Sequence, residues 1–137
     1  MARSTIAAVL LALLLTANPA AAADSFDGSA NLICSVTKVV GCVDGSQCLQ
    51  GTARTFDLPT LMAIAFDEKV VRQARESGDD SVSPIKNIEV TGTQLVLQGV
   101  ENGHGWVMAI HRENGQMSVG AIGEDLSFSM FGFCTAP

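Results

Sequence analysis

The clearest pattern in the chain is an alternation of apolar and polar residues along its second half. It runs from about residue 93 to residue 134 and is interrupted by Asn-Gly pairs at 102–103 and 114–115. A period of two is typical of strands with one buried face. Asn-Gly pairs favour two-residue type I′ turns, because both central residues need a positive φ. The pattern predicts four antiparallel strands, at about 93–100, 105–113, 116–123 and 126–134.

Two-residue turns at 102–103, 114–115 and, with weaker turn chemistry, 124–125 also predict which residues face one another. The predicted pairs are Leu95–Ile110, Leu97–Met108, Gly99–Trp106, Ile110–Val119, Met108–Ala121, Trp106–Gly123, Ala121–Phe128 and Val119–Met130. Both Asn-Gly turns place Trp106, Met108 and Ile110 on one face, opposite small or apolar partners. We expect Gly99 to leave room for the indole of Trp106.

The other face of these strands is apolar for a surface in contact with water. It carries Val96, Gln98, Val107, Ala109, His111, Ser118, Ile122, Ser129, Phe131 and Phe133. Either the first half of the chain covers part of this face, or the face is a contact surface. We expect it to be covered, which is the commoner case.

The first half of the chain is less regular. Residues 31–43 are rich in β-branched residues and predict a strand, and residues 47–58 are its candidate partner after a turn at Asp44-Gly45. Residues 58–77 fit either a helix or two strands around a turn at Asp67-Glu68. The polar stretch 76–84 is expected to be an exposed loop between two halves of one domain.

The N-terminus has the features of a secretory signal peptide. Arg3 precedes an apolar run over residues 6–15, and Ala21-Ala22-Ala23 is a small-residue cleavage site. The apolar run is shorter than the roughly 20 residues that a membrane span needs. We expect cleavage after Ala23, a single β domain over residues 24–137, no membrane or lipid anchor, and a periplasmic or secreted protein.

Four cysteines, an even number, predict two disulfides in an exported chain. Of the three possible pairings we favour Cys42–Cys48, which closes a turn, and Cys34–Cys134, which ties the first strand to the last. A structural zinc site is disfavoured because the chain lacks a Cys-x-x-Cys pair.

The charge of the chain limits its partners. Fourteen acidic against eight basic residues give a net charge of −6. Nucleic acid and anionic membrane surfaces are poor partners, because phosphate contacts need clustered Lys and Arg. A basic protein would be attracted, although ordinary solubility is the commoner reason for such a charge.

Several short motifs resemble those of a known family. They are a cysteine-rich start, Leu58-Pro59, "LVLQGVENGHGW", "ENGQMS" and a terminal "FGFCT". Together they resemble an uncharacterised family of small exported proteobacterial proteins with an "LQG…G.GW" hairpin and a C-terminal "FG.CT". The resemblance covers nearly all of residues 24–137 and implies strand, turn and strand over 61–75. The family has no assigned activity. Its members often carry Asp in the strand after the tryptophan, at the position of His111 in this chain, so no carboxylate role carries over.

A broader likeness is to small disulfide-bonded periplasmic barrels that inhibit C-type lysozymes. Those inhibitors resemble this chain in size, acidity and export. Their contact motifs are a Ser-Gly…Tyr loop and a Trp-x-Lys-Gly strand. This chain has no tyrosine, and "VMAI" follows Trp106. The likeness is therefore an analogy of fold.

Candidate chemistry is sparse. His104 is expected at a turn and His111 farther along the strand on the opposite face, so the two histidines do not converge on a metal ion. Ser118 is expected to face His111. A cross-strand hydrogen bond is a simpler role for this pair than catalysis. The acidic pairs at 79–80 and 124–125 lie in predicted turns, and a catalytic acid needs a desolvated carboxyl group.

The sequence as a whole predicts an all-β fold, an antiparallel meander of about seven or eight strands forming a small barrel or rolled sheet with two disulfides. We expect a monomeric, non-enzymatic binding or interaction protein without a metal or other cofactor. Its partner is either a protein, with a basic one suiting the net charge, or a small ligand held inside the barrel near Trp106. The candidate binding residues are Glu101, His104, Trp106, His111, Phe131 and Phe133.

Overall fold

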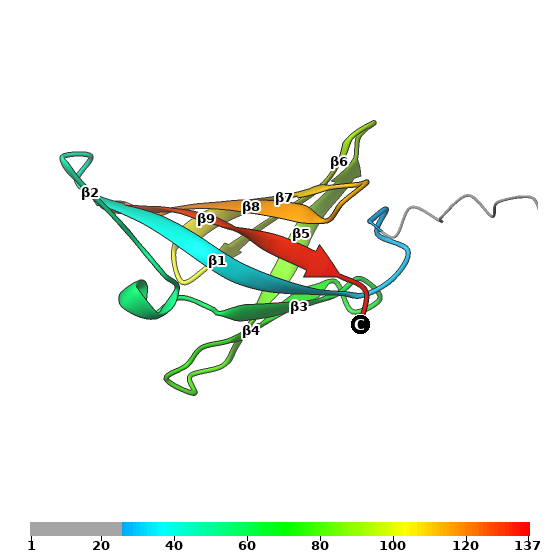
Figure 1. Cartoon of the computed structure of the whole chain (residues 1–137), viewed down its shortest axis with the longest axis horizontal. Coiled ribbons are helices and arrows are strands. Elements are labelled where there is room, and N and C mark those ends of the chain that lie inside the picture. Colours follow the sequence, from blue (N-terminus) through cyan, green and yellow to red (C-terminus); the bar gives the residue numbers. More distant parts are fainter. Residues whose placement is uncertain (1–25) are drawn as a thin grey trace, which may run out of the picture.

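The structure is a computed structural model that describes residues 26–137, and it confirms the all-β prediction (Figure 1). Nine strands of this part of the chain form one antiparallel sheet. Their bounds are β1 Leu32–Val43, β2 Gln47–Gly51, β3 Leu61–Ala65, β4 Val70–Ala74, β5 Ser81–Val90, β6 Gln94–Glu101, β7 His104–His111, β8 Gln116–Ile122 and β9 Leu126–Thr135. A 3₁₀ helix, η1, spans Arg54–Phe56. The proposed signal peptide, with its cleavage after Ala23, lies outside the described residues.

Eight of the strands close into a barrel, and β2 lies outside it as an additional strand. The barrel closes because β1 pairs with β9 along nearly its whole length, while β3 pairs with the first part of β1 and β2 with the last part. A β-bulge between Val36 and Lys38 interrupts the register. Gly132 lies across this bulge, where a Cβ would be 1.8 Å from the carbonyl oxygen of Ser35. The residue there must be glycine for the two strands to approach so closely.

The register of the second half confirms two of the three predicted turns. Asn102 and Gly103 have φ of 48° and 78°, as a type I′ turn requires, and Gly99 pairs with Trp106. The two-residue turn at 124–125 is also confirmed, since Val119 pairs with Met130. The prediction was wrong at 114–115.

The loop between β7 and β8 has four residues, Arg112 to Gly115, and therefore shifts the pairing by two positions. Met108 pairs with Val119 instead of Ala121, and Trp106 with Ala121 instead of Gly123. A shift of two keeps every side chain on its predicted face. Ser118 consequently pairs with Ala109, so the predicted contact with His111 was wrong.

The ambiguous segment 58–77 forms the hairpin of β3 and β4, as the family resemblance implied, and not a helix. Strand β2 returns after the Asp44-Gly45 turn as predicted, but it ends at Gly51 and the chain continues into η1. The predicted loop over 76–84 was too long. Ser81–Pro84 belongs to β5 and pairs with β4, so the turn covers only 75–80, and residues 76–80 are its exposed part.

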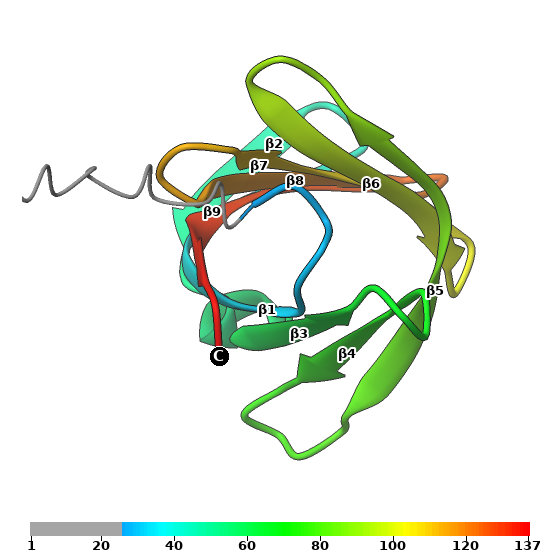
Figure 2. The same cartoon turned by 90° about the vertical axis from the view of Figure 1, so that its right-hand side faces the viewer.

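Side chains from alternate positions of the strands fill the barrel. The buried core includes Leu32, Val39, Ile64, Leu95, Leu97, Met108, Ile110 and Met117. The segment before β1 crosses one end of the barrel (Figure 2). There the side-chain oxygen of Asn31 accepts a hydrogen bond of 3.0 Å from the backbone N–H of Phe66, and Gly28 lies against Phe66 and Leu95. This end of the barrel is closed by the protein itself.

Both predicted disulfides are present. Cys34–Cys134 joins facing residues of β1 and β9, and Cys42–Cys48 joins facing residues of β1 and β2. Disulfides are typical of proteins that fold outside the reducing cytoplasm. Among residues 26–137 no helix has the length and apolar character to cross a membrane.

The outer face of β7, β8 and β9 is not covered, contrary to our expectation. The first half of the chain completes the barrel instead of packing over this face. Val107, Phe131, Phe133 and Ile122 are 41%, 43%, 56% and 67% exposed.

Candidate functional site

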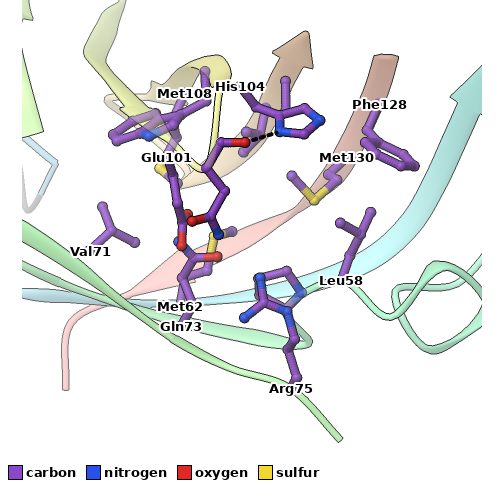
Figure 3. Close-up of a pocket in the computed structure, with 15 residues that line it drawn as sticks. Leu58, Met62, Val71, Gln73, Arg75, Glu101, His104, Met108, Phe128 and Met130 are labelled. Atoms are coloured by element: carbon purple, nitrogen blue, oxygen red, sulfur yellow. Dashed lines mark hydrogen bonds between the residues drawn. The ribbon is translucent and has the colours of Figure 1, made fainter. Parts of the chain in front are cut away.

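The end of the barrel opposite the N-terminal segment opens into a pocket of about 210 Å³ (Figure 3). We call it the mouth pocket. Its lining residues come from the loop after η1 and from strands around the barrel. They are Leu58, Pro59, Met62, Val71, Gln73, Arg75, Glu101, Asn102, His104, Trp106, Met108, Val119, Ala121, Phe128 and Met130.

Most of the mouth pocket is apolar, and its floor is the barrel core. Met62, Met108 and Met130 are each at most 6% exposed and belong to that core. At the rim, Phe128 packs edge-on against Phe56 of η1, with ring centroids 5.8 Å apart. Both rings lie over Gly41, where a Cβ would come within 2.9 Å of Phe56. The glycine thus lets the two rings pack against β1 and holds η1 beside the loop that supplies Leu58 and Pro59 to the pocket.

Trp106 forms one wall of the mouth pocket and is held on two sides. Its indole lies over Gly99, where a Cβ would be 2.4 Å from Cζ2. The indole nitrogen donates a hydrogen bond of 2.9 Å to the hydroxyl of Ser83 on β5, a fully buried side chain. These contacts confirm the predicted role of Gly99 and fix the orientation of the indole.

The polar groups of the pocket gather at one part of its lining. Glu101 and Gln73 point toward each other in Figure 3, and the Gln73 side-chain amide donates a hydrogen bond to the Glu101 carboxylate. The Arg75 guanidinium follows on the same side. It donates to the carbonyl oxygens of Asp57 at 3.2 Å and Asp79 at 3.0 Å, and to the Ser81 hydroxyl at 3.0 Å.

His104 lies at the base of the β6–β7 turn. Its Nδ1 is 3.0 Å from the carbonyl oxygen of Asn102. A carbonyl can only accept, so Nδ1 carries the proton of this hydrogen bond. The ring also covers Gly123, where a Cβ would come within 2.6 Å. His104 therefore lies next to the turn, as expected, and its ring packs against the barrel rim.

The structure divides the predicted binding residues into two groups. Glu101, His104 and Trp106 meet in the mouth pocket. Phe131 and Phe133 lie on the outside of β9, where Phe131 borders a shallow outer groove together with Val107 and Ala109. The sixth residue, His111, ends β7 on the outer face and accepts a hydrogen bond of 3.3 Å from the backbone of Glu113.

Other candidate chemistry does not assemble in the described part of the chain. No three His, Cys, Asp or Glu side chains of residues 26–137 come together as a metal site would require. Asp79, Asp80, Glu124 and Asp125 are exposed, in agreement with their expected positions in turns.

Sequence reasoning missed Gln73, Arg75 and Ser83. Gln73 and Arg75 lie in the segment for which helix and hairpin were both possible predictions. Ser83 lies in the stretch that was predicted to be a loop. The strand alternative contained the signal, because it places Val71 and Gln73 on the same face. Without the pairing of β4 with β5 and of β5 with β6, nothing connects these residues to Trp106.

The chain matches no known family model, no curated protein and no solved structure. Its resemblance to the family of small exported proteins stays a prediction from short motifs.

Proposed function

We propose that this is an exported, non-enzymatic binding protein that takes a small ligand in the mouth of its barrel. One observation carries the proposal: the barrel is closed at one end and opens at the other into an apolar pocket with its polar groups on one side. Ligand sites typically combine apolar walls with a few polar groups that orient the ligand. The loop after η1 and the strands around the barrel supply that arrangement here.

The pocket is also held in shape before any ligand arrives. Trp106 is fixed by Ser83 and Gly99, and Arg75 by hydrogen bonds to three other residues. Ordering side chains on binding costs about 0.5–1.5 kcal/mol each. A preorganised lining avoids much of this cost, and it supports binding as the role of the site.

Export is part of the same proposal. The two disulfides support an oxidising compartment, and the N-terminal sequence supports a signal peptide cleaved after Ala23. We propose a periplasmic or secreted monomer.

The proposal is tested by filling the pocket. Ala121 lines the mouth pocket and Ala109 borders the outer groove, and both are half-buried strand residues. The ligand probe is 1-hexanol, and binding is followed by fluorescence of the single tryptophan, Trp106. Ala121→Leu is expected to abolish the response, while the matched variant Ala109→Leu keeps it. No saturable response in the unmodified protein, or loss of the response in Ala109→Leu alone, would count against the mouth pocket.

A second candidate is a protein partner on the outer face, as the lysozyme inhibitors of similar architecture suggest by analogy. The observation in its favour is the exposure of Phe131 and Phe133 on one side of β9, at 43% and 56%. Large exposed apolar side chains close together often mark a contact surface, and the net charge of −6 favours a basic partner. Binding to an immobilised basic enzyme such as a C-type lysozyme tests it, with Phe131→Ser and Phe133→Ser expected to abolish capture.

A further inference from the structure

The polar part of the mouth pocket carries two opposite charges that do not pair with each other. Two surface ion pairs, Arg54 with Glu76 and Arg72 with Glu68, involve neither of these charges. Arg75 and Glu101 lie on the same side of the pocket yet make their contacts with other groups (Figure 3). A cation and an anion thus face the same space separately.

Each of these charges has hydrogen-bonding capacity left over. The partners of Arg75 occupy Nε and Nη1, and its Nη2 makes no hydrogen bond within residues 26–137. Glu101 accepts the bond from Gln73 at Oε2, and its Oε1 has no partner in the same part of the chain. Arginine nitrogens are strong donors to carboxylates, and a carboxylate oxygen accepts readily from an ammonium group.

The remaining pocket sets the size and character of the rest of the ligand. Its walls beyond the charged side are Met62, Val71, Trp106, Met108, Val119 and Met130. The volume of about 210 Å³ is below the roughly 300–1,000 Å³ of sites for drug-sized molecules. An apolar group of a few carbon atoms fits this space.

We infer that the mouth pocket binds a small zwitterion with an apolar side chain, of the type of a free apolar α-amino acid. The inference rests on the proposed function of the pocket and names its ligand class. The ligand carboxylate binds Arg75 Nη2, its ammonium binds Glu101 Oε1, and its side chain enters the apolar interior. A simple anion would leave its charge facing Glu101, and a simple cation would face Arg75. A zwitterion satisfies both charges at once.

The test uses the oxidised protein and the emission of Trp106. It is titrated with L-leucine and L-methionine, with N-acetyl-L-leucine, which lacks the ammonium group, and with L-leucinamide, which lacks the carboxylate. The two amino acids are expected to bind, and each modified compound to bind about tenfold to a hundredfold more weakly, because one charge-assisted hydrogen bond is lost.

Two variants assign the charges. Glu101→Gln has nearly the same shape and keeps an acceptor for Gln73, so the variant is expected to fold. Its affinity for L-leucine is expected to fall about tenfold or more, while its affinity for N-acetyl-L-leucine stays unchanged. Arg75→Gln is expected to lower the affinity for both of these compounds and to leave the affinity for L-leucinamide unchanged. Glu113→Gln, an exposed carboxylate on the loop after β7, is the control and leaves all affinities unchanged.

The failure of this inference is distinguishable from that of the proposed function, because 1-hexanol is titrated in parallel. Binding of 1-hexanol without binding of the amino acids, or equal binding of L-leucine and N-acetyl-L-leucine, overturns the zwitterion and leaves the pocket as a site for apolar ligands. No binding of any of these compounds overturns both.

Discussion

The indole nitrogen of Trp106 on β7 donates a hydrogen bond of 2.9 Å to the hydroxyl of Ser83 on β5. Strand β6 lies between β5 and β7 in the sheet, so the hydrogen bond crosses over β6 on the inside of the barrel. Ser83 is fully buried, and the bond satisfies the polar groups of both side chains. It links the predicted hairpin to a strand residue that the sequence placed in an exposed loop.

Replacing Ser83 by alanine is expected to destabilise the protein by about 1–3 kcal/mol, because the indole N–H of the half-buried Trp106 loses its acceptor. Urea unfolding measures the free energy, and the emission of Trp106 reports its altered surroundings. Ser118→Ala is the control, since Ser118 is exposed on the outer face and surface changes stay within about 0.5 kcal/mol. Equal stability of the two variants would refute the role of this bond.

Gly99→Ala is expected to destabilise the protein by about 1–3 kcal/mol through overpacking. The added Cβ would lie 2.4 Å from Trp106 Cζ2 and 2.6 Å from the carbonyl oxygen of Pro84, so the indole must move away from its position in the pocket wall. Both Trp106 fluorescence and the response to ligand are expected to change.

The matched variant is Gly92→Ala on the β5–β6 turn, where a Cβ meets nothing within 4 Å. It is expected to be neutral or slightly stabilising, because alanine reduces the freedom of the unfolded chain. If Gly99→Ala proved as stable as Gly92→Ala by urea unfolding, the close packing of Trp106 on β6 would be wrong.

The two disulfides are expected to differ in their contribution to stability. Cys34–Cys134 closes a loop with a sequence separation of 100, and Cys42–Cys48 one of 6. The loop-closure model gives about 4.7 kcal/mol for the longer loop and about 2 kcal/mol for the shorter. Double alanine variants of each pair, compared by urea unfolding, check the order, and a larger loss from the Cys42–Cys48 pair would contradict it.

The sequence was sufficient where the decisive interactions are local. The hairpin around 102–103 follows from its turn residues and from alternation on both sides, and it brings Glu101, His104 and Trp106 to one end of the barrel. Faces were predicted correctly even where a register was wrong, because an error of two residues preserves the alternation.

The remainder of the site depends on contacts between distant segments. Gln73 and Arg75 reach the mouth pocket because β4 pairs with β5 and β5 with β6. Their own segment has a composition that fits helix and strand almost equally, and tertiary pairing decides between the two. Closure of the barrel likewise depends on the pairing of β1 with β9. The only sequence signal for it was the favoured Cys34–Cys134 disulfide, one of three possible pairings of the cysteines.

The loop at 114–115 shows how a tertiary contact overrides turn chemistry. Asn114 does not adopt a positive φ, and its side chain accepts a hydrogen bond of 2.9 Å from the backbone of Gln116. Gly115 donates to His111 at 2.9 Å and accepts from Cys134 at 2.8 Å, so β9 holds the loop in its four-residue form. Both hairpins carry the same Asn-Gly pair, but the loop at 114–115 contacts β9, whereas an added Cβ at Gly103 would meet no atom within 4 Å.

This difference predicts unequal effects of replacing the two turn glycines by alanine. Gly103 has φ of 78° and no atom within 4 Å of an added Cβ, so Gly103→Ala is expected to cost about 1–2 kcal/mol from backbone strain alone. Gly115 has φ of 73°, and its Cβ would lie 2.4 Å from the carbonyl oxygen of Cys134 and 2.6 Å from the ring of Phe26. Gly115→Ala is therefore expected to cost about 1–3 kcal/mol more. Urea unfolding of the two variants measures the difference, and equal losses would show that β9 and the N-terminal segment do not hold this loop.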